Sequence, residues 1–155
     1  MFLPFKKQSN LSYRIIPIRQ VVEKIERSYG VTLFHLSPKR IFFITKDREL
    51  CLCSPSSKFY KTVNRYWVDI TIKQKEILDS YKKSLLVFRL ENEQIFFVEW
   101  TRLSPLLTSK TMQYNTHEQY HWKLYIYNDY IHVGKSKNIL SGEIEPFANW
   151  RKNEN

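Results

Sequence analysis

The sequence has few of the residues that build phosphate loops, disulfide frameworks or membrane spans. Only three glycines occur in 155 residues, and none lies in a glycine-rich phosphate-binding motif or a nucleophile elbow. The two cysteines, Cys51 and Cys53, fall on one face of an alternating stretch, where a disulfide is rare and a reducing compartment is expected. No apolar run approaches the length of a membrane helix. We therefore expect a cytoplasmic protein without a membrane partner.

Acidic residues are also scarce relative to basic ones. Lysine and arginine number 25 against 15 aspartates and glutamates, which gives a net charge of +10. A small body with this charge attracts polyanions such as nucleic acids. The alternative is that the excess of lysine serves only solubility.

The length fits one domain that is able to bury its own core. Residues 1–12 are expected to form a flexible basic arm, residues 13–150 a single β-rich domain, and residues 151–155 a tail. Ten phenylalanines, ten tyrosines and four tryptophans favour pleated strands.

The hydrophobic spacing predicts the elements of this domain. A helix is expected after Pro17, with a left-handed cap at Gly30, and a second one, with a capping box at Thr71 and Gln74, up to about Lys83. Period-two alternation predicts strands at 31–36, 41–45, 50–53, 66–70, 85–90, 94–100, 122–127 and 130–133. The fold class is therefore α+β and mostly β, as an open β-barrel or a strongly bent antiparallel or mixed sheet with two short helices.

One enzyme motif is present. His117 and His121 bracket an H-E-x-x-H sequence, which on a helix places two zinc ligands on one face. The next residues, Trp122 to Tyr127, alternate as a strand does, so no metal site is expected, and His117 and His121 are kept only as an alternative.

A metal-dependent nuclease is a further alternative. Two or three carboxylates beside a lysine suit metal-assisted cleavage of a phosphodiester, and Asp69, Glu76 and Glu99 with Lys73 offer such a set. Their spacing does not show that they meet, and Asp69 can equally lie on a solvated strand face.

Basic and amide side chains in two loops favour nucleic-acid binding. Lysine and arginine neutralise phosphates, and arginine and the amides have the forked geometry that reads base edges. Aromatic residues nearby, Tyr66, Trp67, Trp100 and Trp122, are more often core residues than stacking platforms. The candidate contact residues are Lys58, Lys61, Asn64, Arg65, Arg102, Lys110, Gln113 and Asn115.

Over about residues 31–135 the chain resembles the B3-like DNA-recognition domains of restriction endonucleases. The resemblance rests on the order of elements, on the strands Tyr66–Ile70 and His121–Ile126, and on the basic polar loops between them. It implies an open β-barrel with two loop arms, here residues 55–65 and 103–116, that grip the major groove.

The sequence thus predicts a domain that binds double-stranded DNA in a sequence-specific manner, with a role in restriction, phage defence or transcription control. We expect a binding protein rather than an enzyme, with no cofactor. The expected partner is nucleic acid, in particular double-stranded DNA, and a nuclease subunit or another protein is the alternative partner. The alternatives are a small basic inhibitor or adaptor of a nucleic-acid-handling enzyme and a metal-dependent nuclease or hydrolase.

Overall fold

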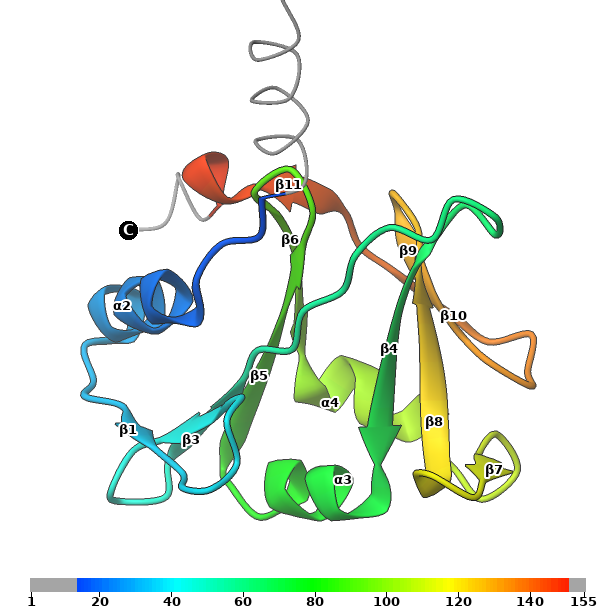
Figure 1. Ribbon diagram of the computed structural model, residues 1–155. Coiled ribbons are helices and arrows are strands. Elements are labelled where there is room, and N and C mark those ends of the chain that lie inside the picture. Colours follow the sequence, from blue (N-terminus) through cyan, green and yellow to red (C-terminus); the bar gives the residue numbers. More distant parts are fainter. Residues whose placement is uncertain (1–13, 151–155) are drawn as a thin grey trace, which may run out of the picture.

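The computed structural model describes residues 14–150 (Figure 1). The predicted arm at residues 1–12 and the tail at 151–155 lie outside the described residues. In chain order the elements are α2 (Ile18–Tyr29), β1 (Phe34–His35), β2 (Phe42–Ile44), β3 (Leu50–Cys53), β4 (Tyr66–Thr71), α3 (Ile72–Asp79), β5 (Lys83–Leu90), β6 (Gln94–Glu99), α4 (Trp100–Leu103), η1 (Ser104–Leu106), β7 (Gln113–Asn115), β8 (Gln119–Ile126), β9 (Tyr130–Val133), β10 (Ile139–Ser141), β11 (Ile144–Pro146) and η2 (Phe147–Asn149).

The strands form two sheets. The first has the order β1-β2-β3-β5-β6-β11, and the second has the order β10-β9-β8-β4, with β7 added beside β8. The pairing of β3 with β5 is parallel, whereas the other paired strands run antiparallel. The predicted class, α+β and mostly β, is confirmed, and neither sheet closes into a barrel.

Strand β5 separates two hydrophobic cores. Its side chains alternate between the faces of the first sheet: Leu86 and Phe88 pack toward the second sheet, and Leu85 and Val87 pack on the other side. The first core lies between the sheets and includes Leu78 of α3 and Trp100 of α4, and the second lies under α2 and includes Trp150. The first sheet is thus covered on both faces, while the second sheet is covered on one (Figure 1).

The two predicted helices begin and end through local bonds. Gly30 adopts φ 64°, and its amide donates to the carbonyl of Glu26, which closes α2 as predicted. Helix α3 begins with the predicted capping box, in which the amide of Gln74 donates to Oγ1 of Thr71 and the amide of Thr71 donates to Oε1 of Gln74.

Helix α3 ends at Asp79 rather than near Lys83, so the predicted C-terminal bound was wrong. Lys83 instead begins β5, which pairs with β3 from Leu50 onward. The strand expected up to Trp100 likewise ends at Glu99, because Trp100 begins α4 and its indole N–H donates to Asp79 at 2.7 Å. These boundaries are set by partners distant in the sequence, which local periodicity does not register.

The sequence predicted no element between residues 103 and 116 or beyond residue 133, and the structure has several. Strands β7, β10 and β11 have three residues each, and η1 and η2 are single turns. Three residues are too few to show a period, so such edge strands are identified only by their pairing. No helix within residues 14–150 is long and apolar enough to cross a membrane.

Both cysteines are free and buried on β3. They face the core between the sheets, which agrees with their predicted placement on one face. Burial raises the pKa of Cys51 to about 12 and raises the pKa of Cys53 well above its usual value.

We expect the native protein to resist thiol reagents. At pH 8 a thiol with a pKa of about 12 is ionised in roughly one molecule in ten thousand, against about one in four for a free cysteine. Titration with a chromogenic disulfide should therefore detect little reaction in buffer and both thiols in denaturant. Rapid labelling of folded protein at pH 8 would contradict the burial of Cys51 and Cys53.

Candidate functional site

The uncovered face of the second sheet gathers polar and aromatic side chains. Along β4, Tyr66, Val68 and Ile70 enter the core, so Trp67 and Asp69 lie on the opposite face. In the antiparallel register Asp69 lies opposite Lys123 and Thr71 lies opposite His121. We call this surface the outer face; it comprises Lys58, Tyr60, Arg65, Trp67, Asp69, Glu118, His121, Lys123, Tyr125, Tyr127, Tyr130 and His132.

Aromatic rings form a continuous row across the outer face. The ring centroid of Trp67 lies 5.7 Å from that of Tyr60 and 6.1 Å from that of Tyr125. Tyr125 lies 5.9 Å from His132 on β9. At the end of the row Tyr127 stacks on Tyr130 at 4.7 Å. All six of these side chains are partly exposed, so the row is open to solvent along its length.

Cations lie directly over these rings. The guanidinium carbon of Arg65 is 3.6 Å from the centroid of Tyr125, and Nζ of Lys123 is 4.2 Å from that of Trp67. Such contacts hold the charge at a fixed position while leaving its outer side hydrated. Nη1 of Arg65 also donates to the hydroxyl of Tyr127 at 3.2 Å.

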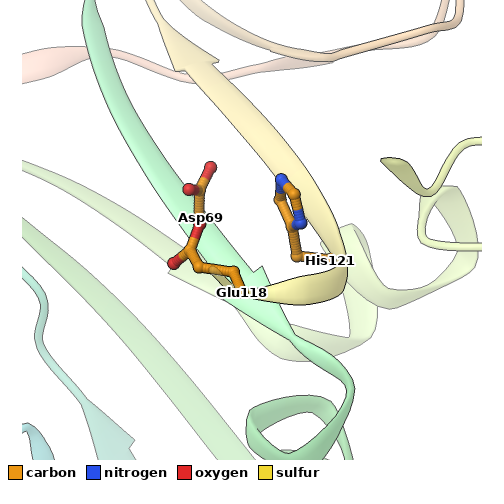
Figure 2. A group of neighbouring side chains, drawn as sticks. All are labelled: Asp69, Glu118 and His121. Atoms are coloured by element: carbon orange, nitrogen blue, oxygen red, sulfur yellow. The ribbon is translucent and has the colours of Figure 1, made fainter. Parts of the chain in front are cut away.

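At the other end of the outer face, Asp69, Glu118 and His121 converge (Figure 2). One ligand atom from each lies within 4.8 Å of the other two, and no other such group of three histidine, cysteine, aspartate or glutamate residues occurs in residues 14–150. Oδ1 of Asp69 accepts from the indole N–H of Trp67 at 2.7 Å and lies 3.5 Å from Nζ of Lys123. Asp69 therefore connects the aromatic row to the cluster.

The two carboxyl groups share a hydrogen bond, and their pKa values move apart. Burial alone would raise the pKa of Asp69, but the hydrogen bonds from Glu118 and Trp67 and the charge of Lys123 outweigh it and lower the pKa. The hydrogen bond with Asp69, followed by burial, raises the pKa of Glu118.

The ring of His121 is fully buried and only half satisfied. Its Nδ1 lies 2.8 Å from the carbonyl oxygen of Gln119, a residue with φ 60°. A carbonyl only accepts, so Nδ1 carries the proton and Nε2 carries a lone pair. Within residues 14–150 this Nε2 has no hydrogen-bond partner, although the side chain is 0% exposed.

The two predicted loop arms lie at opposite ends of the outer face. Residues 55–65 lead into Tyr66, which pairs with Ile126, whereas residues 103–116 lead toward His121, which pairs with Thr71. The five residue steps between Tyr66 and Thr71 correspond to about 17 Å. The arms therefore border one surface from its two ends.

The predicted contact residues divide between this surface and structural roles. Arg65 and Lys58 lie over rings of the outer face. Lys61 and Asn64 are exposed in the first arm and Lys110 in the second. Asn115 is used locally, because its Oδ1 accepts from the amides of His117 and Glu118 at 3.0 and 2.6 Å.

Gln113 and Arg102 have different surroundings. A Cβ on Gly134 would lie 2.6 Å from Nε2 of Gln113 and 3.2 Å from the ring of Tyr125, so glycine lets the Gln113 amide approach the outer face. Arg102 donates to the carbonyl of Ser141 at 2.8 Å. It belongs to α4 and has no contact in common with the aromatic row among the described residues.

In each of the two alternative catalytic sets, the member residues lie at different places in the structure and do not all come together. His117 is exposed in the turn between β7 and β8, while His121 is buried on β8, so the H-E-x-x-H residues lie on a hairpin and not on a helix. Of the carboxylates, Asp69 alone joins the cluster: Glu76 and Lys73 lie on α3, and Glu99 lies 3.9 Å from Lys83. The cluster takes Glu118 and His121 from the motif and Asp69 from the carboxylate set.

Sequence reasoning missed Glu118, Lys123 and Tyr125 as members of a site. The alternation of residues 121–127 predicts that Lys123 and Tyr125 share a face, but it does not reveal that this face carries Asp69 from a strand about fifty residues earlier. Glu118 was noticed only as the centre of a helical motif.

A large hollow lies away from the outer face. It has a volume of about 460 Å³ and is bordered by α2, β3, β5 and β6, including Leu50, Lys83 and Glu99. Its lining has no cluster of ligand or nucleophile groups within residues 14–150. A smaller hollow of about 180 Å³ adjoins Tyr60, Trp67 and Asp69 on the outer face.

The chain was compared with models of protein families, with curated proteins and with solved structures. None of the three comparisons finds a match.

Arg65 and Lys61 provide a test of how the first arm is built. Replacing Arg65 with alanine removes a cation–π contact and a hydrogen bond, and we expect it to lower the free energy of unfolding by about 1 to 3 kcal/mol. Lys61→Ala removes an exposed charge and should change the free energy of unfolding by less than about 0.5 kcal/mol. Urea denaturation followed by tryptophan fluorescence measures both. Equal effects would show that the Arg65 contacts contribute nothing to stability.

Proposed function

We propose that this protein binds nucleic acid and that the outer face is its contact surface. The observation that carries the proposal is the alternation of partly exposed aromatic rings with fixed cations on one sheet face. Bases stack on such rings in proteins that bind single strands, and neighbouring cations neutralise the phosphates.

The geometry of the row suits several successive bases. Tyr60, Trp67 and Tyr125 have ring centroids 5.7 and 6.1 Å apart, and extended single strands place consecutive bases at comparable or slightly larger spacing. Stacking contributes about 1 to 3 kcal/mol per base. A nucleic-acid strand that follows the row would cross β4, β8 and β9 and pass Lys123 beside Trp67 and Arg65 beside Tyr125.

The net charge supports association with a polyanion. The surplus of ten positive charges raises the local concentration of nucleic acid and speeds encounter. Asp69 and Glu118 are the acidic groups on this face, and Lys123 offsets the charge of Asp69.

A single strand is the ligand that we favour, and double-stranded DNA is the second candidate. Partly exposed rings suit unpaired bases, because bases in a duplex expose only their edges. Exposed Lys61, Asn64 and Lys110 at the two ends of the face favour the duplex, since they could contact phosphates from both arms. A role in restriction, phage defence or transcription control, and a place in the cytoplasm, belong to this proposal.

Fluorescence anisotropy with labelled oligonucleotides of about 12 units tests the proposal. We expect binding to a single strand that is at least about tenfold tighter than to the matching duplex, and an affinity that falls steeply between about 50 and 200 mM salt. Absence of binding to both at low salt would refute the proposal, and tighter duplex binding would favour the two-arm alternative. A protein partner that persists in pull-downs after nuclease treatment, with no binding to either oligonucleotide, would favour the adaptor alternative.

Two matched variants locate the contact surface. Lys58 and Lys82 are both exposed, but Lys58 lies over Tyr60 on the outer face, whereas Lys82 lies beside Glu49, just before β5 of the first sheet. Each change to glutamine removes one positive charge, so both variants lower the net charge of the protein by the same amount. We expect Lys58→Gln to lower the salt slope by about 0.7 for a single strand and Lys82→Gln to leave it unchanged. Tyr60→Leu should weaken binding at least about fivefold through lost stacking. If Lys58→Gln and Lys82→Gln have the same salt slope, the contact surface lies elsewhere.

A further inference from the structure

One ring nitrogen of the buried His121 side chain, Nε2, is unsatisfied within residues 14–150. A buried polar atom without a partner costs about 1 to 3 kcal/mol, and Nε2 of His121 is such an atom within residues 14–150. Its ring is oriented by the bond from Nδ1–H to the carbonyl of Gln119. Histidines that ligate metals have this arrangement, in which one nitrogen is fixed by a backbone carbonyl and the other is free.

Two oxygen donors stand beside this ring. Figure 2 shows the carboxyl groups of Asp69 and Glu118 next to each other, with the imidazole of His121 standing beside them on β8. The three residues come from β4, from the hairpin turn and from β8, and the pairing of β4 with β8 over six residues holds them in place. Asn115 fixes the turn, because its Oδ1 accepts from the Glu118 amide at 2.6 Å.

We propose that Asp69, Glu118 and His121 form a binding site for a divalent transition-metal cation such as Zn²⁺ or Mn²⁺. One imidazole nitrogen and two carboxylate oxygens are the donor set that these ions accept, whereas Ca²⁺ and Mg²⁺ prefer oxygen alone. Donors that share a tetrahedral ion lie about 3.4 Å apart, since each bond is about 2.1 Å. The present limit of 4.8 Å requires a contraction of up to about 1.4 Å.

The surroundings supply what a metal site needs beyond its ligands. The indole N–H of Trp67 donates to Oδ1 of Asp69 at 2.7 Å, which leaves the second oxygen for the cation. Three protein ligands leave at least one coordination position for water or for an oxygen of a bound ligand.

This site differs from the one that the H-E-x-x-H motif implies. On a helix His117 and His121 would both be ligands, but His117 is exposed in the turn and is not a member of the cluster. Asp69, remote in the sequence, takes its place. His117 is therefore a matched control for His121.

Calorimetric titration of the untagged full chain with MnCl₂ or ZnCl₂, without nucleic acid, tests the inference. We expect one cation per chain, and the visible absorption of added Co²⁺ should report nitrogen and oxygen ligands. The isosteric variants Asp69→Asn and Glu118→Gln should bind at least about tenfold more weakly, and His117→Ala should bind as the unaltered chain does. Circular dichroism checks that each variant is folded.

The outcomes are decisive without reference to the proposed function. Absence of saturable binding of Mn²⁺, Zn²⁺ and Co²⁺ would overturn the site, as would binding that survives in folded Asp69→Asn and Glu118→Gln. A loss in His117→Ala equal to that in Glu118→Gln would also overturn it, because His117 would then be a ligand. Metal binding does not require the aromatic row, so it can succeed where nucleic-acid binding fails.

Discussion

The alternation of side chains along β5 is the constraint on which the rest of the structure depends. Leu86 and Phe88 face the core between the sheets, and Leu85 and Val87 face the core under α2. A strand that is apolar on both faces must be buried on both, so the first sheet becomes the middle layer of the molecule. The second sheet then has one face against the first and one face free. Every group discussed as a site lies on that free face because no other layer covers it.

The free face is stabilised by polar and aromatic contacts in place of a hydrophobic core. Arg65 lies over Tyr125, Lys123 lies over Trp67, and Trp67 donates to Asp69. These contacts link the aromatic row to the Asp69 cluster within one strand pair, so a ligand on the row and a cation at the cluster would be neighbours. The same contacts have a plain structural value, since each offsets the exposure of a large ring. A surface built in this way is ordered before any ligand arrives, which lowers the entropy cost of binding.

The candidate site was visible in the sequence as fragments assigned to different hypotheses. The H-E-x-x-H motif contributed Glu118 and His121, but its helical interpretation gave them His117 as a companion, and the carboxylate set contributed Asp69 with Glu76 and Glu99 as companions. The strand character of residues 122–127 was the correct objection to a helix. That strand pattern did not reveal that β4, which carries Asp69, is a neighbour of β8. In the same way Asn115, predicted to face a ligand, is occupied by the turn that positions Glu118.

The sequence alone determined the features that depend on neighbours in the chain. The cap at Gly30, the capping box at Thr71, the shared face of Cys51 and Cys53 and the class of the fold all follow from residues a few positions apart. Only the tertiary structure decided which strands are neighbours, that β3 and β5 run parallel, and that Asp69 lies opposite Lys123. The physical reason is that a strand's period specifies which residues share a face, whereas its partner is chosen by burial and hydrogen bonding summed over the whole chain.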